Sequence, residues 1–180
     1  MITPKAEYKN MIDHRLEENW KSFNILLGLK HYGNCISIIC QELDQYVRIL
    51  FLLKQNAIEQ ENLNNNSINN QKWPKIGSDG KKEYITNESI SSFARELSGW
   101  ESEIYRFGIV FENISSNFNY VVKDPIKGLD DQERKIVYDY VKDHHDSNFP
   151  KSYTIEDLMP VFPMIFMKIP NSIREYSKLF

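Results

Sequence analysis

The segment Asn34–Gln55 constrains the fold of this chain more than any other, because its hydrophobic residues recur every three or four positions. That spacing is the period of an amphipathic helix, and about six turns of it are enough to organise a helical bundle. The apolar residues with this spacing are Ile36, Ile39, Leu43, Tyr46, Val47, Leu50 and Leu53. The polar residues that recur on the other side are Ser37, Gln41, Asp44, Gln45 and Arg48. Asp44 and Arg48 therefore lie one turn apart on an otherwise apolar helix, where a charge requires a structural or functional reason.

Other stretches repeat the helical period and predict an all-α single domain, residues 1–180, built as a bundle of five to six helices. They are residues 8–29, 86–97, 100–121, 131–144 and a last helix after Thr154, kinked by Pro163 and Pro170. The break at Gly28–Gly33 is short, so we expect the first two helices to form a long antiparallel pair. No two segments carry the turn chemistry of a hairpin, so we expect no sheet.

Residues 59–85 interrupt the helical pattern with a run of Asn, Ser and Gly. These residues favour turns, and their side chains compete with helix by bonding to nearby backbone groups. We therefore predict a long, Asn-rich surface loop here. By contrast, Thr86, Asp130 and Thr154 stand where N-caps are expected, with Asp130-Asp131 placing negative charge at a helix start.

The charge balance argues against broad electrostatic binding to nucleic acid, since the net charge is −3 and the isoelectric point is about 5.8. A local basic patch stays compatible with these values.

The longest apolar runs are far shorter than the roughly 20 residues that a membrane helix needs, and no signal-peptide pattern opens the chain, so we expect a soluble, cytoplasmic protein. Cys35 and Cys40 are five positions apart on one helix and point in different directions, so we expect them not to pair.

Motifs for cofactors and metals are absent from the sequence. Gly77-Ser78-Asp79-Gly80 lacks the residues that complete a phosphate-binding loop. The two cysteines have no zinc-ligand spacing, and we expect both in the core. His144 and His145 point about 100° apart on a helix, which favours a helix-end role that complements the dipole over a metal site. We therefore expect neither a metal nor a cofactor.

The stretch Gln41–Leu50 resembles the second-helix signature of the HEPN superfamily, with Asp44 at the acidic position and Arg48 at the basic one. HEPN domains are helical bundles, usually dimeric, found in RNA-cleaving toxins, defence systems and nucleotide-handling proteins. Their active members carry an Arg followed after four to six residues by a His on a late helix. In this chain Arg106 matches the Arg, and Asn113 stands where the His would fall.

That replacement bears directly on activity, because an amide cannot exchange a proton near neutral pH as an imidazole does. Asn113 retains a donor for a phosphate, and Arg106 and Arg48 retain guanidinium groups that bind one. The resemblance therefore implies a ligand site at Arg48, Arg106 and Asn113, with Asp44 as a further candidate. The alternative interpretation is a buried ion pair, in which Arg106 faces Asp44 or Glu42 and holds two helices in register.

Three hypotheses follow. The first is a catalytically weakened HEPN-like module that binds RNA, a nucleotide or an operon-encoded protein partner in a bacterial toxin or anti-phage context. The second is a HEPN-like metal-independent ribonuclease that uses residues other than the missing His. The third is a non-enzymatic helical interaction protein.

Because residues 49–53 are apolar all around the helix, and residues 159–169 add a further apolar surface, we also predict a homodimer.

Overall fold

The computed structural model describes residues 3–76, 80–115 and 124–179, without the side chains of residues 112–115. These ranges contain eight α-helices, one short 3-10 helix and one two-stranded sheet, so the all-α single domain is confirmed. The elements are α1 (Pro4–Gly28), α2 (Tyr32–Leu53), α3 (Ala57–Ile68), β1 (Pro74–Ile76), β2 (Lys82–Tyr84), α4 (Asn87–Arg95), α5 (Trp100–Ser115), η1 (Pro125–Gly128), α6 (Asp131–His144), α7 (Ile155–Leu158) and α8 (Phe162–Tyr176).

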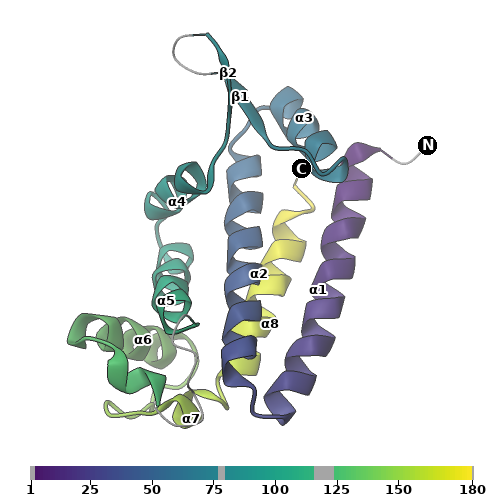
Figure 1. The fold of residues 1–180 in the computed structure, drawn as a ribbon. Coiled ribbons are helices and arrows are strands. Elements are labelled where there is room, and N and C mark those ends of the chain that lie inside the picture. Colours follow the sequence, from purple (N-terminus) through teal and green to yellow (C-terminus); the bar gives the residue numbers. More distant parts are fainter. Residues whose placement is uncertain (1–2, 77–79, 116–123, 180) are drawn as a thin grey trace.

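Helix α2 is the centre of the bundle and packs against α1, α5 and α8 (Figure 1). Its apolar stripe is buried, as the sequence predicted, and includes Ile36, Ile39, Leu43, Tyr46, Val47 and Leu50. α1 and α2 form the expected antiparallel pair. The turn between them reverses at Lys30, which has a φ of 59°, whereas Gly33 lies inside α2.

Aromatic side chains join the helices of the core. Phe23 of α1 stacks on Phe166 of α8, with 4.7 Å between the ring centroids. Phe107 of α5 lies 4.6 Å from Tyr140 of α6, and Phe111 lies 5.5 Å from Phe162. All of these rings are almost inaccessible to solvent, so they contribute to stability through buried area as well as through ring contacts.

The predicted helix starts are confirmed at three places. Thr86 accepts a hydrogen bond from the backbone of Ser89, and both Asp130 and Thr154 form reciprocal capping boxes. The last predicted helix is divided into α7 and α8, with Pro163 in the first turn of α8 and Pro170 inside it. This division, together with α3, explains why the predicted number of five to six helices was too low.

The prediction of a long Asn-rich loop at residues 59–85 was wrong. The Asn-rich run forms α3, which Asn56 caps and which packs against α1. Leu63 and Asn64 are buried on that contact, and burial outweighs the weak helix preference of asparagine. The expectation of no sheet was also wrong, because β1 and β2 pair antiparallel, with Pro74 opposite Tyr84 and Ile76 opposite Lys82.

The apolar run at residues 49–53 is largely covered within the chain. Ile49, Leu50 and Leu52 are buried, while Phe51 packs against Trp73 and Phe93. The run therefore does not by itself demand a second subunit, and the homodimer stays a prediction. Cys35 and Cys40 are not joined by a disulfide bond, as expected. Within the described ranges, the helices lack the combination of length and apolar character that crossing a membrane requires.

Substituting alanine for Phe23 tests the packing of α1 on α8. Phe23 is fully buried, so Phe23→Ala should lower the free energy of unfolding by about 3–5 kcal/mol. Met11→Ala on the same helix should change it by less than about 0.5 kcal/mol, because Met11 is 45% exposed. Urea denaturation measures both. An equally large loss of stability in the Met11 variant would contradict the position of Met11 on the exposed side of α1.

Candidate functional site

A groove with a volume of about 380 Å³ lies beside α2, where α4 and α5 approach it. Its polar walls come from Arg15, Gln41, Asp44, Arg48, Asn87, Ser91 and Tyr105. Its apolar floor comes from Cys40, Leu43, Val47, Ile90 and Ile109, with Gly108 between them. This size is at the lower end of the range that small-molecule sites occupy, and the mixture of an apolar floor with a few polar groups is typical of them.

Arg48 is held in place at one end of the groove. Its Nε donates to Asp44 Oδ2 at 2.8 Å, and its Nη2 donates to Asn87 Oδ1 at 2.9 Å. The guanidinium carbon also lies 6.0 Å from the centre of the Trp73 ring. Because three residues hold this side chain, the guanidinium is preorganised rather than free to swing into solvent.

Arg15 supplies a second guanidinium from α1. Its Nη2 donates to the carbonyl of Gln41 at 2.9 Å and its Nη1 to Gln45 Oε1 at 3.1 Å. Gln41, Asp44, Gln45 and Arg48 share one side of α2, so both guanidinium groups lie along the same polar stripe. Arg15 could not be recognised from the sequence, because its partners are about 30 positions away.

Glu42 lies beneath Arg15 and is fully buried. Its Oε1 accepts a hydrogen bond from Asn19 and lies 3.7 Å from Arg15 Nε, whereas Oε2 has no partner among the described residues. Burial raises the pKa of this carboxyl group, and the contacts with Asn19 and Arg15 oppose that rise only in part. Glu42 therefore belongs to the interface between α1 and α2 rather than to a pair with Arg106.

The opposite wall of the groove depends on Gly108. A Cβ atom at this position would lie 2.4 Å from Leu43 Cδ1, so a side chain here would collide with α2. The glycine therefore lets α5 approach closely and places Tyr105 at the rim of the groove. The N-terminus of α4 reaches the rim at Asn87, and the positive end of its dipole favours an anion there.

Arg106 lies away from this groove. Its side chain is exposed and is absent from the lining, because Ile104 and Gly108 take the inner side of α5. No ion pair within the described ranges joins Arg106 to Asp44 or Glu42; Asp44 pairs with Arg48 instead. The alternative interpretation, a buried ion pair between Arg106 and Asp44 or Glu42, is therefore wrong. Asn113 belongs to α5, and its side chain lies outside the described residues.

The histidines at the end of α6 make specific contacts. His144 Nε2 bonds to Glu103 Oε2 of α5, and His145 Nε2 lies 3.3 Å from the hydroxyl of Tyr140. Burial lowers the pKa of His145 to about 4, with further contributions from the charges of Lys168 and His144. His145 is therefore neutral near pH 7, so it does not act as the cation that the sequence suggested for this helix end. Within the described residues, no three potential ligands gather closely enough to hold a metal ion.

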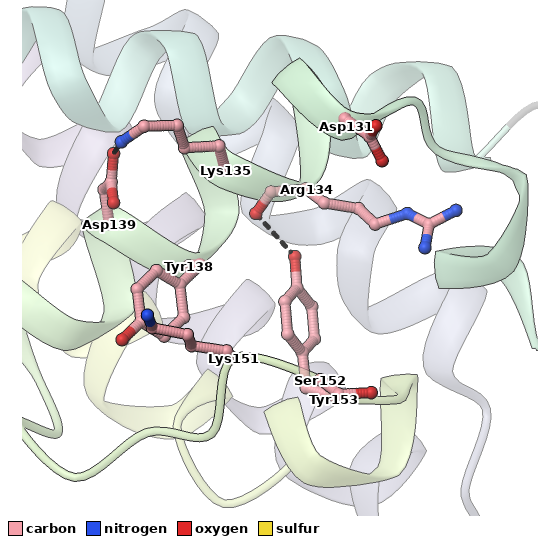
Figure 2. Close-up of a pocket in the computed structure, with 8 residues that line it drawn as sticks. All are labelled: Asp131, Arg134, Lys135, Tyr138, Asp139, Lys151, Ser152 and Tyr153. Carbon is pink, nitrogen blue, oxygen red and sulfur yellow. Dashed lines mark hydrogen bonds and ion pairs between the residues drawn. The ribbon is translucent and has the colours of Figure 1, made fainter.

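A second cleft, with a volume of about 520 Å³, lies between α6 and residues 151–153 (Figure 2). Its polar groups already serve the fold. Tyr153 donates a hydrogen bond to the carbonyl of Arg134, and Lys135 pairs with Asp139. The guanidinium of Arg134 donates to the carbonyl of Leu129. This cleft is larger than the groove at α2, but only the groove brings two guanidinium groups and the N-terminus of α4 to one apolar floor, so the groove is the stronger candidate.

Comparison with protein-family models, with curated proteins and with solved structures finds no match to this chain. The geometry of the site therefore carries the functional argument.

The buried carboxyl group predicts a distinctive dependence of stability on pH. A group whose pKa is raised by folding contributes stability below its unfolded pKa, and that contribution is lost as the pH rises through the folded value. Glu42→Gln should therefore be about as stable as the wild type at about pH 4, and more stable than the wild type at about pH 8. Thermal unfolding at both pH values measures the difference. Exposed Glu61, substituted in the same way, serves as the control and should show no such trend; an identical trend would refute the assignment.

Proposed function

We propose that this protein is a HEPN-like helical module, catalytically weakened, that binds the phosphate of a nucleotide or of RNA in the groove beside α2. One observation carries the proposal. Two guanidinium groups, from Arg15 and Arg48, border one small groove together with the N-terminus of α4. Guanidinium groups and helix N-termini are the groups that proteins use to bind phosphate.

The remaining walls suit the other parts of a nucleotide. The floor formed by Leu43, Val47 and Ile90 is apolar, and Tyr105 offers a ring at the rim on which a base can stack. Asp44 reduces the local positive charge, but it also fixes Arg48 in position. This combination favours one bound nucleotide unit over a long run of phosphates.

The same proposal places the protein in the cytoplasm as a homodimer within a bacterial toxin or anti-phage system. Met164 and Met167 of α8 are 46% and 37% exposed and offer apolar surface to a second copy or to an operon-encoded partner. Light scattering in dilute solution tests the dimer, and a mass of 21.3 kDa would refute it.

Arg48 is the residue whose loss tests the groove. Arg48→Gln should weaken binding of uridine monophosphate by about ten- to a hundredfold, the usual range for a lost hydrogen bond to a charged group. Arg174→Gln is a matched control, because Arg174 also lies beside an aspartate, at 3.8 Å from Asp13, but on another face. Titration calorimetry measures both. If Arg48→Gln binds like the wild type and Arg106→Gln does not, the site is at Arg106 instead.

One observation favours the alternative of a metal-independent ribonuclease. His144 and Glu103 form an imidazole–carboxylate pair, and Arg106 lies one turn beyond Glu103 on α5. A carboxylate that orients an imidazole, with a guanidinium close by for the phosphate, supplies the elements of proton transfer at a 2′-hydroxyl. In this alternative His144 takes the role of the imidazole that Asn113 lacks.

Cleavage of single-stranded RNA tests this alternative. His144→Ala should reduce any cleavage by about 10²–10⁴-fold and Glu103→Gln by less, whereas uridine monophosphate should still bind in the groove. His14→Ala, at an exposed position on α1, is the control. A wild-type protein that leaves the RNA intact over hours removes the ribonuclease alternative and leaves the binding module.

A further inference from the structure

The hairpin formed by β1 and β2 has two chemically different faces. Residues directly opposite in an antiparallel pair share a face, and neighbours along a strand alternate between faces. The register therefore places Pro74, Ile76, Lys82 and Tyr84 together on one face. The other face carries Lys75 and Glu83, which form an ion pair at 3.2 Å.

The base of the hairpin is held by Trp73, which directly precedes β1. The carbonyl of Trp73 accepts a hydrogen bond from the backbone of Ile85. Trp73 is 8% exposed, stacks on Phe51 at 6.1 Å and donates its indole N–H to Ser67. These contacts anchor the base of the hairpin, and the two strands extend beyond the ends of the helices (Figure 1).

The face of the hairpin that carries Ile76 and Tyr84 is exposed, aromatic and basic. Tyr84 is 45% exposed and Ile76 is 74% exposed. The ammonium groups of Lys72 and Lys82 each lie 5.8 Å from the centre of the Tyr84 ring. Among the residues that the structure describes, no carboxylate lies within ion-pair distance of either lysine. In a chain with a net charge of −3, this is a local concentration of positive charge around an accessible ring.

We infer that this face of the hairpin, with Tyr84 at its centre, binds single-stranded nucleic acid and leads it toward the groove at Arg48, an inference that rests on the proposed function. Single strands expose their bases for stacking on an aromatic ring, while the two lysines near the ring contact phosphates of the same strand. Arg48 connects the two regions, because its guanidinium lies beside Trp73 at the base of the hairpin and also lines the groove. The substrate class is thus an oligonucleotide whose strand lies over Tyr84 and whose end unit occupies the groove.

The test compares an oligouridylate of about 12 nucleotides with uridine monophosphate. Tyr84→Ala should weaken binding of the oligonucleotide roughly tenfold and Tyr84→Phe should preserve it, because stacking needs only the ring. Lys72→Gln combined with Lys82→Gln should weaken binding and reduce the slope of log K against log salt by about 1.4, as expected for two phosphate contacts on a single strand. None of these changes should alter binding of the monophosphate.

Fluorescence anisotropy of the labelled oligonucleotide measures these effects. The matched control combines Lys142→Gln with Lys151→Gln, which removes the same charge elsewhere; Lys142 also lies beside a tyrosine, 5.5 Å from the ring of Tyr138. The control should bind like the wild type. An equal loss in the control would show that net charge, and not this face, governs binding, and would overturn the inference.

The outcomes for the hairpin and for the groove are separable. Oligonucleotide binding that ignores the hairpin variants overturns the inference, while monophosphate binding that depends on Arg48 still supports the groove. Oligonucleotide binding that depends on Tyr84, with no monophosphate bound, supports the hairpin and ends the proposal for the groove. A wild-type protein that binds neither probe overturns both.

Discussion

Burial of α2 from several sides is the constraint on which the rest of this structure depends. A helix with this much apolar surface is stable only if other elements cover it, and α1, α5 and α8 do so. The cover is close, because Gly108 lets α5 approach Leu43 without an intervening side chain. The polar stripe that ends at Arg48 lies at the edge of this cover. The groove is therefore a direct consequence of how the central helix is packed.

The interface between α1 and α2 adds a second constraint, because it buries polar groups as well as apolar ones. Glu42 is fully buried with one oxygen unpartnered, and Arg15 bonds to two residues of the same stripe. If α1 slid along α2 by one turn, more of these buried polar groups would lose their hydrogen-bond partners. Leaving a buried polar group without a partner costs more free energy than exchanging one apolar contact for another. The polar contacts thus define the register of the pair and fix the Arg15 guanidinium at the groove.

The sequence predicted those parts of the fold that depend on local chemistry. The period of α2 and the caps at Thr86, Asp130 and Thr154 are properties of short segments, and all were confirmed. Helix α3 was missed because its stability comes from burying Leu63 against α1, which no local preference of asparagine reveals. Arg15 and the pair of His144 with Glu103 were missed because their partners lie far away in the chain. The outward position of Arg106 was readable, however: it lies about 200° around α5 from the buried Ile104.

The inferred binding of single strands has to be reconciled with the acidic character of the protein, and the location of the cations offers a way. At a distance the negative net charge repels nucleic acid, and salt screens that repulsion beyond roughly 8–10 Å. Binding then depends on contacts at short range. Lys72 and Lys82 lie near the ring of Tyr84, and Arg48 lies beside Trp73 at the base of the hairpin. A duplex would present its phosphates without an accessible base, so it would meet the same repulsion without the stacking contact. The arrangement therefore favours single strands by pairing each cation with an aromatic surface rather than by accumulating charge.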